Sequence, residues 1–371
     1  MKTPSENAMA ILHYEDFDAV PVVDFGFWND TVEKWIAEGK LKREELPEEI
    51  GDRHYFVARC LGFDFSWETC FGTRNGLMPP FKTEIIEERP DGSYLERDGN
   101  GVVMMKKHGV TSIPVEVSHT LVDRESWEEH YLPRLQFTQE RADFTAERIA
   151  ASGSRYNAAP RLLHVGSLFG SIRDITGVVG YSYIMADDEE LFAEIIDTFG
   201  DIAYKALKAV LDVCDSFDGI HFWEDICFKN GPLINPSVFE ELVGPHYKKV
   251  TGLAREHGID LASLDCDGCI DKLVPIWLEN GVNTMFPIEV GVWNASIAPW
   301  REQYGRELKG VGGMDKRVFA HDKAAVDAEI ERLRPLIELG GYIPCPDHRI
   351  APDAKYELVQ YYCDRMHSLK I

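Results

Sequence analysis

From about residue 160 onward the sequence repeats one unit, in which an apolar segment is followed by a loop and an amphipathic helical segment. Near-continuous apolar strands that alternate with helices are typical of a parallel sheet covered on both faces. The opening segment 20–28 (VPVVDFGFW) adds one more strand, so seven of the eight repeats of a closed (β/α)₈ barrel are present. The six later apolar segments are PRLLHVGSL (160–168), GIHFWED (219–225), LASLDCD (261–267), NTMFPIE (283–289), LKGVGGMD (308–315) and GYIPCPD (341–347).

Helix boundaries and glycines agree with a barrel. Segment 235–258 is expected to form one helix that has Asn235 as N-cap and Pro236 at its first position and ends at Gly258. Gly310-x-Gly312-Gly313 lacks the third glycine and the following acidic residue of a dinucleotide-binding loop, so it is interpreted as a tight turn. The absence of that fingerprint favours the closed barrel over an open, doubly wound sheet.

The region 82–109 differs from the rest, because apolar and polar residues alternate around two turn sequences, at 90–92 and 98–101. This pattern predicts a three-stranded β-meander. Segments 30–60 and 124–153 are expected to be helical. The predicted fold is α/β, a single (β/α)₈ TIM barrel domain over 1–371 with an N-terminal extension and the meander as an insertion. A homodimer is expected, with the exposed meander as its candidate interface.

The charge balance excludes some classes of function. The chain has 63 acidic and 39 basic residues and a formal net charge of −24, so it offers no basic surface for nucleic acid. Its apolar runs are shorter than the ~20 residues that a membrane span needs. The start, MKTPSENAMAILHYED, lacks the pattern of a secretory signal, so a cytoplasmic location is expected, with no nucleic acid or membrane as partner.

Carboxylates gather at the predicted ends of the strands, which in a barrel meet at one mouth where active sites lie. Like charges at short range raise one another's pKa values unless protons or a cation neutralise them. A mixed set of oxygen, sulfur and nitrogen donors suits Zn²⁺. We therefore expect a metal site at the mouth; its predicted ligands are Asp267, Glu289 and Cys345, with Asp265 or His348 as further ligands.

Simpler interpretations of these residues stay open. Asp267 could cap the following helix, Cys345 could be a buried apolar residue, and His348 could bind the backbone of a loop. Lys229 or Arg317 could neutralise a buried carboxylate without any metal.

Three segments resemble the uroporphyrinogen decarboxylase superfamily: HFWEDICFKNGPLINP (221–236), GGMDKR (312–317) and GGYIPCPDHRIAPDAKYE (340–357). The resemblance implies a (β/α)₈ barrel with its site at the mouth. True uroporphyrinogen decarboxylases carry an arginine-rich early segment for the substrate's carboxylates. Here residues 24–30 (DFGFWND) contain no arginine and add aspartates, which disfavours a porphyrinogen substrate.

The chain more closely resembles the superfamily's zinc-dependent methyltransferases, which exchange methyl groups with a corrinoid protein and are similar to cobalamin-independent methionine synthase. Their His-x-Cys pair falls on Asp265-x-Asp267, their last-strand cysteine on Cys345, and a glutamate ligand on Glu289. Two carboxylates thus replace a nitrogen and a sulfur ligand. The resemblance implies a zinc that is a harder Lewis acid, suited to the oxygen of a methyl ether or methanol.

The resulting hypothesis is a methyltransferase that moves a methyl group from a small methoxylated or methylamine-type donor to the Co(I) of a separate corrinoid protein, with a metal as Lewis acid. The chain has no Asp-x-His-x-x-Gly corrinoid signature, so a partner would carry the corrinoid. His348 or Glu224 would act as general acid, and Asp225 and Asn230 would orient neighbouring side chains. The predicted substrate-binding residues are Phe25, Trp28, Trp223, Lys229 and Arg317.

Two other hypotheses remain. One is a metal-independent decarboxylase of a smaller carboxylic acid, with Arg317 and Lys229 binding the carboxylate. The other is a barrel that carries a ligand without chemistry, whose acidic mouth is solvated surface.

Overall fold

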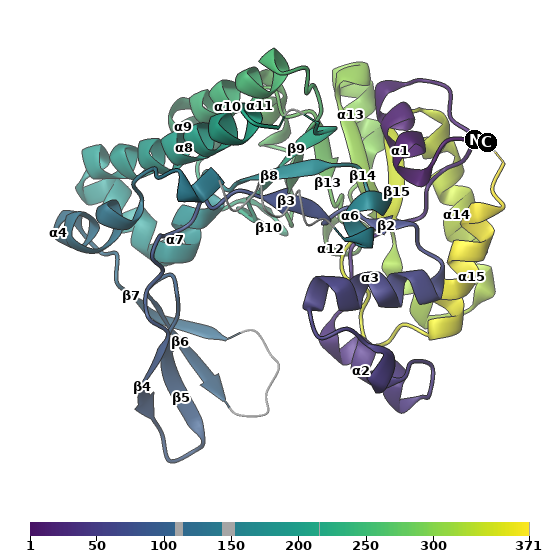
Figure 1. Ribbon diagram of the computed structural model, residues 1–371, viewed down its shortest axis with the longest axis horizontal. Coiled ribbons are helices and arrows are strands. Elements are labelled where there is room, and N and C mark those ends of the chain that lie inside the picture. Colours follow the sequence, from purple (N-terminus) through teal and green to yellow (C-terminus); the bar gives the residue numbers. More distant parts are fainter. Residues whose placement is uncertain (108–113, 143–152, 215, 371) are drawn as a thin grey trace.

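A computed structural model describes residues 1–107, 114–142, 153–214 and 216–370. Its centre is a parallel β-sheet with helices on its outer face (Figure 1). The strands of this sheet follow the order β15-β14-β13-β12-β9-β8-β3, which is that of consecutive β/α repeats. Their bounds are β3 (Cys70–Gly72), β8 (Leu162–Gly166), β9 (Gly219–Trp223), β12 (Ala262–Asp265), β13 (Thr284–Phe286), β14 (Lys309–Met314) and β15 (Tyr342–Pro346).

Two short strands close the sheet into a barrel. β1 (Val23–Asp24) pairs in parallel with β2 (Phe65–Ser66), which lies just before β3 in the chain. On the other side, Phe27 forms a parallel bridge with Ile350, in the segment that follows β15. The α/β barrel expected from the sequence is confirmed. The eighth strand of the barrel, which the sequence did not reveal, is formed by β2 and β3. Each of these two pieces has only two or three residues, which is too short to show a pattern.

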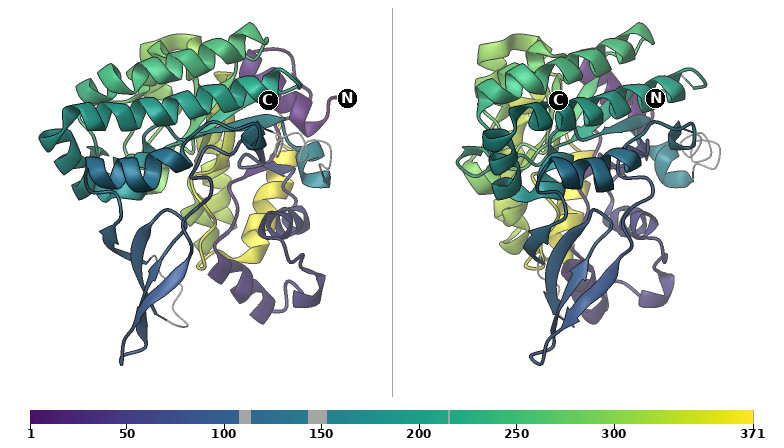
Figure 2. Two further views of the ribbon diagram at one scale, coloured as in Figure 1. Left: turned by 60° about the vertical axis from the view of Figure 1, so that its left-hand side comes forward. Right: turned by 90° about the vertical axis from the view of Figure 1, so that its left-hand side faces the viewer.

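Helices surround the barrel on its outside (Figure 2). Asn235 caps α9 as expected, since its side chain accepts a hydrogen bond from the Ser237 N–H. The single helix expected over 235–258 is wrong, however, because the chain breaks at Val243 into two helices. The outer helices are α7 (Gly170–Asp187), α8 (Glu189–Leu211), α9 (Pro236–Leu242), α10 (Gly244–Glu256), α11 (Val274–Glu279), α12 (Val290–Trp293), α13 (Ile297–Tyr304), η4 (Gly305–Glu307), η5 (Lys316–Ala320), α14 (Lys323–Glu338) and α15 (Tyr356–His367).

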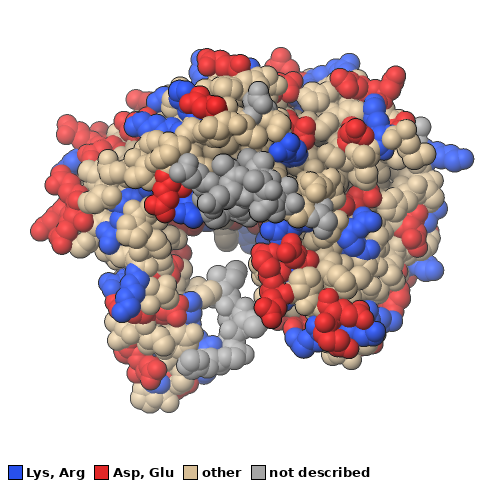
Figure 3. Space-filling view, in the orientation of Figure 1, with Lys and Arg blue, Asp and Glu red and all other residues tan. Residues whose placement is uncertain are grey.

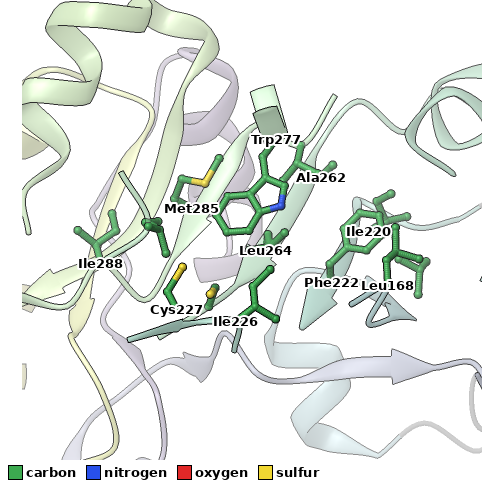
Figure 4. Packing of buried hydrophobic residues seen from close by; sticks show 14 of the residues in the cluster. Leu168, Ile220, Phe222, Ile226, Cys227, Ala262, Leu264, Trp277, Met285 and Ile288 are labelled. Carbon is green, nitrogen blue, oxygen red and sulfur yellow. The ribbon is translucent and has the colours of Figure 1, made fainter. Parts of the chain in front are cut away.

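The main hydrophobic core lies between the strands and these helices. Figure 4 shows part of it, where Trp277 of α11 packs beside Leu264 of β12 and Met285 of β13. Burial of such large apolar side chains contributes about 1.5–3 kcal/mol each to folding, so this layer fixes the strands that carry the polar mouth.

The first helix, α1 (Pro4–His13), closes the end of the barrel opposite the mouth. Ile11 and Leu12 are buried in a second apolar cluster with barrel residues that include Leu261 and Ile343. The N–H of Gly341, just before β15, donates to the Ile11 carbonyl over 3.0 Å. The helix starts with a capping box between Thr3 and Glu6, which fixes its first turn.

An antiparallel sheet projects from the barrel as an arm (Figure 1). The β-meander expected at about 82–109 is confirmed, but the sheet has a fourth strand and extends to His119; residues 108–113 lie outside the described part. Figure 3 shows a hollow between this arm and the part of the surface that contains α2 (Asn29–Ala37) and α3 (Ile50–Leu61). The strands of the arm are β4 (Glu84–Glu88), β5 (Ser93–Arg97), β6 (Val102–Lys107) and β7 (Val115–His119).

Short elements make up the remaining connections. The helical expectation for 30–60 is met by α2, α3 and the turn between them, whereas 124–153 contains only short helices and its residues 143–152 lie outside the described part. These elements are η1 (Arg43–Glu45), α4 (Arg124–Ser126), η2 (Trp127–Tyr131), η3 (Leu132–Arg134), α6 (Ser154–Ala158), β10 (Cys227–Phe228) and β11 (Gly231–Pro232). In the described ranges, no helix combines the length and apolar character needed to cross a membrane.

The glycines at 310–313 lie inside strand β14, so their interpretation as a tight turn is wrong. Gly312 has a φ of +130°, and a Cβ there would lie 1.5 Å from the Pro287 carbonyl oxygen. A glycine is needed at this position because the neighbouring backbone approaches too closely for any side chain.

Candidate functional site

Three aspartates meet at the carboxyl ends of the neighbouring strands β9 and β12. Asp265 is the last residue of β12 and pairs in register with Trp223, the last residue of β9. Asp225 and Asp267 each lie two residues beyond these strand ends, and one carboxylate oxygen from each of the three aspartates lies within 4.8 Å of the others. The Asp267 N–H also donates to Oδ1 of Asp225 over 3.0 Å. We call Asp225, Asp265 and Asp267 the aspartate cluster.

Asp265 is the most isolated member of the aspartate cluster. The residue is 4% exposed, and among the described residues none donates a hydrogen bond to its carboxylate. Burial, reinforced by the charges of Asp225 and Asp267, raises its pKa well above the usual range. A proton or a cation would stabilise a carboxylate in these surroundings, because burial and neighbouring negative charges both disfavour its ionised form.

The other two aspartates show the same shortage of positive partners. Burial, followed by the charge of Asp267, raises the pKa of Asp225 to about 6. Oδ1 of Asp267 is buried and has no hydrogen-bond partner among the residues that the structure describes. The aspartate cluster is therefore under-compensated, as expected of ligands whose positive partner comes from outside the chain.

His348, after β15, borders the aspartate cluster with a defined tautomer. Its Nδ1 accepts a hydrogen bond from the Arg349 N–H at 2.7 Å, so Nδ1 carries no proton. In the neutral ring the proton is then on Nε2, which lies 3.1 Å from Oδ2 of Asp267. The sequence prediction that places His348 in the site agrees with this position, and the backbone contact fixes which nitrogen donates.

Two aromatic side chains cover the His348 ring. Phe25 lies at a centroid distance of 5.2 Å and also contacts Phe286 edge-on at 4.5 Å. Trp28 stacks on the imidazole at 5.6 Å with an interplanar angle of 17°, and 42% of its surface stays exposed. Two of the three predicted aromatic residues, Phe25 and Trp28, therefore lie against His348 beside the aspartate cluster.

Glu289 lies beside the aspartate cluster but is not one of its members. Its Oε2 accepts the Gly268 N–H at 2.5 Å, and burial followed by the charge of Asp267 raises its pKa to about 7. Lys316 lies near Asp347, Glu289 and Asp267, and burial lowers its pKa. Lys316 is thus the nearby cation that the chain itself supplies.

Cys345 is not a member of the aspartate cluster. It is fully buried within the barrel, in the apolar cluster that contains Val311 and Ile343. Burial, reinforced by the charges of Asp24 and Glu68, raises the pKa of its thiol well above the usual range. Its role as a metal ligand stays a prediction. Of the predicted ligand set, the structure brings together Asp265 and Asp267, with Asp225 in place of Glu289 and Cys345.

The carboxylate of Glu224 holds the backbone at the start of α7 in place. One carboxylate oxygen accepts the Leu168 N–H and the Tyr247 hydroxyl, and the other accepts the N–H groups of Phe169 and Gly170 and the Ser167 hydroxyl. These donors occupy both oxygens and tie the end of β9 to the start of α7. The side chain is fully buried, so its predicted role as a general acid has no support from its contacts.

The other predicted substrate-binding residues lie outside the aspartate cluster. Trp223 lies under the guanidinium of Arg173 at 5.6 Å. Arg317 is mostly exposed and pairs with Asp315 at 2.8 Å. Lys229, with Asn230, is exposed in the turn between β10 and β11. The structure therefore does not bring Lys229 and Arg317 together as a carboxylate-binding pair.

Several residues at the mouth were not predicted from the sequence. Asp24, at the end of β1, is fully buried, and burial raises its pKa to about 7. Glu68 forms an ion pair with Arg349 at 2.8 Å. Asp24 ends a recognisable strand and could have been found by the same strand-end argument as Asp265. Glu68 could not, because it lies between the two short pieces β2 and β3.

The kinds of ligand atom in the site indicate which metal its residues could hold. Three carboxylates with an adjacent imidazole form an oxygen-rich site, which suits hard divalent cations such as Mg²⁺ or Mn²⁺ and also allows Zn²⁺. The pKa values of Asp225 and Asp265 stay raised although Arg173 and Arg349 act in the opposite direction, so the charges of the chain only partly compensate the aspartate cluster. The residues therefore fit a divalent cation, but they do not form the thiolate-containing zinc set expected from the sequence.

No protein-family model matches the chain, and no curated protein matches it. Among solved structures, the chain is similar to a methyltransferase from Methanosarcina mazei, with a TM-score of 0.62, 14% identity, and 99% of each chain covered. It is also similar to a B12-independent methionine synthase from Shewanella sp. W3-18-1 in complex with selenomethionine, with a TM-score of 0.48 and 12% identity over 95% of this chain and 98% of that one. At such identities the first likeness concerns architecture alone. The chain thus shares its barrel fold with the Methanosarcina mazei protein.

Proposed function

We propose that this chain is a methyltransferase that uses a divalent cation, held by the aspartate cluster, to activate a methylated small molecule. The single observation that carries the proposal is the aspartate cluster, whose three carboxylates lie within 4.8 Å of one another and include an oxygen, Oδ1 of Asp267, that is buried without a hydrogen-bond partner among the described residues. The cation, when bound, would supply Lewis acidity toward the oxygen or nitrogen atom that carries the methyl group.

His348 is placed to hydrogen-bond the oxygen that the methyl group leaves. When a methyl group leaves an ether, the bonding electron pair stays on the oxygen, which must then be protonated. His348 holds its only proton on Nε2, because the Arg349 N–H occupies Nδ1, and loss of that proton would leave an imidazolate. We therefore assign His348 as a hydrogen-bond donor that stabilises negative charge on this oxygen, and the proton itself comes from solvent water.

The aromatic side chains suit an apolar methyl donor. Phe25 and Trp28 cover the His348 ring and present apolar surface beside the carboxylates. Exclusion of water by such rings strengthens electrostatic interactions at the site. A methoxylated compound, with one oxygen and a largely apolar body, matches this combination better than a highly charged donor.

The acceptor in this proposal is the Co(I) of a corrinoid carried by a separate protein. Co(I) supplies the electron pair for the new bond to carbon, so the methyl group moves without its bonding electrons. Two observations support this choice: the resemblance to corrinoid-linked methyltransferases, and the fold shared with a protein described as a methyltransferase. Zinc remains one of the cations to be tested, since it accepts carboxylate and imidazole ligands.

Lys316 favours a second candidate, a metal-independent decarboxylase of a small carboxylic acid. Its ammonium group lies near Asp347, Glu289 and Asp267, and burial lowers its pKa. A lysine in this position can neutralise a carboxylate without a metal. This candidate predicts full activity after removal of divalent ions, whereas the methyltransferase predicts none.

The test combines metal analysis with an activity assay. The purified protein is stripped with a chelator, loaded separately with Mg²⁺, Mn²⁺ and Zn²⁺, and assayed for methyl transfer from methoxylated compounds to free cob(I)alamin by visible absorbance. Asp265→Asn should abolish both metal binding and transfer. The matched control is Asp212→Asn, an exposed residue that pairs with Lys208 on the outer helix α8. Transfer that survives complete metal removal, or that Asp265→Asn leaves intact, would contradict the proposal.

A further inference from the structure

Asp225, one of the three members of the aspartate cluster, has a strained backbone conformation. Its φ is +50°, in the left-handed region that residues other than glycine rarely adopt. Such a conformation is unfavourable for an aspartate, although less so than for most side chains, and it persists only where the surrounding structure holds it in place. The contacts of Asp225 therefore determine whether its carboxylate reaches the aspartate cluster.

The position of the Asp225 carboxylate depends on this backbone conformation. Its Oδ1 accepts the Asp267 N–H over 3.0 Å, which joins the loops that follow β9 and β12. The preceding residue still belongs to the barrel, since the Glu224 N–H donates to the Asp265 carbonyl over 2.8 Å and extends the pairing of the two strands. The chain thus leaves the sheet at Asp225 itself, and the direction of the carboxylate follows from the backbone angles of this one residue.

The carbonyl oxygen of Asp225 is bound by Arg173, a residue of the first part of α7. Nη1 of Arg173 donates to this oxygen over 2.6 Å, and Nη2 donates to Oδ1 of Asp174 over 2.6 Å. The guanidinium also lies over the ring of Trp223, the last residue of β9, at 5.6 Å. A guanidinium held by a carboxylate and an aromatic face has little freedom to move, so it fixes the direction of the Asp225 carbonyl.

A kink in α7 sets the position of the segment that carries Arg173. Gly177, one turn further along, has a φ of +65° and a ψ of 166°, so the helix is interrupted there. A Cβ at Gly177 would lie 2.8 Å from Cε1 of His119 and 3.2 Å from Oε2 of Glu116, both on strand β7 of the arm. The segment is thus fixed by the arm at one end and, through the hydrogen bonds to Glu224, by β9 at the other.

We infer that Arg173 is a positioning residue of the proposed metal site. It holds the backbone of Asp225 in the left-handed conformation and thereby directs the Asp225 carboxylate into the aspartate cluster, without being a ligand itself. The inference rests on the proposed function for the presence of a cation, but the effect of Arg173 on Asp225 does not depend on it. Residues that orient metal ligands in this way typically change metal affinity by about 10–100-fold.

Positioning and charge have opposite effects on the binding of a cation. The positive charge of Arg173 repels a divalent cation, so if charge alone mattered, Arg173→Gln would lower the Kd. If Arg173 holds Asp225 in place, the same variant raises the Kd, because one of the three carboxylates loses its direction. A role in the stability of the fold alone leaves the Kd of the folded protein unchanged. The sign of the change therefore distinguishes the three roles.

Metal affinity is measured by isothermal titration calorimetry with Mg²⁺, Mn²⁺ and Zn²⁺ on protein that has been stripped with a chelator. We expect Arg173→Gln to raise the Kd of each cation that the wild type binds by about 10–100-fold, and Arg173→Lys to restore part of the affinity, since its ammonium group can still donate to the carbonyl. Arg301→Gln is the matched control, because Arg301 also donates to a backbone carbonyl, that of Gly340, and lies over the Tyr14 ring at 5.1 Å, but at the barrel floor. An unchanged or lower Kd in Arg173→Gln would overturn the inference.

A double variant tests whether Arg173 acts through Asp225. In the Asp225→Asn background, Arg173→Gln should raise the Kd far less than it does in the wild type, because the carboxylate that Arg173 directs is already gone. The same fold-change in both backgrounds would show that Arg173 acts on the site by another route and would contradict the inference.

Amide hydrogen exchange of the metal-free protein separates the inference from the proposed function. The Asp267 N–H is bound to Oδ1 of Asp225, so its exchange reports the position of that carboxylate directly. It should be faster in Arg173→Gln than in the wild type and unchanged in Arg301→Gln; equal rates in Arg173→Gln and the wild type would overturn the inference. Faster exchange in a protein that binds none of the three cations would overturn the proposed function alone. Arg173→Met, which keeps the apolar stem beside Trp223, takes the place of Arg173→Gln if the latter does not fold, as judged by thermal unfolding.

Discussion

His348 and Asp267 lie in hydrogen-bond contact across the mouth of the barrel, with 3.1 Å between Nε2 and Oδ2. The residues are 81 positions apart in the chain and belong to the ends of different strands. The N–H of Arg349 holds the other ring nitrogen, so the contact has a defined donor. This pair links the residue proposed to stabilise the leaving oxygen with a residue proposed to bind the metal.

The pair predicts the effect of His348→Gln on catalysis. We expect kcat to fall by about 10²–10³, the usual contribution of a donor that stabilises developing negative charge, while KM changes little. The control is His246→Gln, because His246 forms a similar contact with Asp197, at 2.9 Å, between the outer helices α8 and α10. A variant that keeps its kcat would show that His348 does not stabilise the leaving oxygen.

The carboxylates at the mouth predict how stability depends on pH. The folded-state pKa of Glu289 is raised to about 7, above its unfolded value near ~4.3. The folded state therefore binds more protons in this range, and the contribution of Glu289 to stability is present at low pH and lost as the pH rises from about 4 to about 7. We expect the difference in unfolding free energy between the wild type and Glu289→Gln, measured with urea in the presence of a chelator, to decline over this range. A difference that grows with pH would contradict the assignment.

Divalent cations should stabilise the folded protein through the aspartate cluster. A ligand present at 100 times its Kd adds about 2.7 kcal/mol to the unfolding free energy when it binds only the folded state. The Tm should therefore rise with added Mg²⁺, Mn²⁺ or Zn²⁺ in the wild type and not in Asp265→Asn. In the absence of metal, Asp265→Asn should be at least as stable as the wild type near neutral pH, since it removes an uncompensated buried charge. An equal response of both proteins to metal would place the cation elsewhere.

Glu224 should prove to be a structural residue. Replacement by leucine removes the acceptor of three buried backbone N–H groups, those of Leu168, Phe169 and Gly170. Each unsatisfied buried donor costs about 1–3 kcal/mol, so we expect a loss of at least about 3 kcal/mol in urea unfolding. If Glu224→Gln instead keeps full stability and loses activity, the catalytic role expected from the sequence would be supported.

Gly312 should tolerate no side chain. Gly312→Ala would place a methyl group 1.5 Å from the Pro287 carbonyl oxygen, so we expect a loss of about 2–4 kcal/mol in the free energy of unfolding. Gly39→Ala is the matched control, because Gly39 also has a positive φ, +73°, but a Cβ there meets no atom within 4 Å. The control should lose only about 1 kcal/mol, the cost of the backbone conformation. Equal losses for both variants would show that the clash is relieved by movement of the strand.

The barrel was predictable because its evidence is periodic: apolar strands and helices recur in a fixed order, as in 219–225 and 261–267. The strand-end argument likewise placed Asp265 and Asp267 at one mouth. The same argument could not identify the third carboxylate of the cluster, because the direction of a side chain in the loop after a strand does not follow from the strand pattern. Asp225, with a φ of +50°, turns into the aspartate cluster, while Cys345 stays within the strand β15 and inside the barrel.

Other features left no signal in a single sequence. The strand made of β2 and β3 is too short and interrupted to show a period. The pairing of Glu68 with Arg349 joins residues 281 positions apart, and no local pattern reports such a contact. The homodimer, the corrinoid partner and the metal-binding roles of Glu289 and Cys345 stay predictions, and the geometry now favours Asp225 over the last two.

The helix α1 seals the barrel floor with Ile11 and Leu12, next to the ends where the strands begin. A molecule that approaches the aspartate cluster from the opposite end meets Trp28 and His348 first. In the proposed transfer the small donor must therefore be in place before a large acceptor covers that end. Initial-rate kinetics should accordingly be sequential and ordered, with the donor binding first and both reactants present when the methyl group moves.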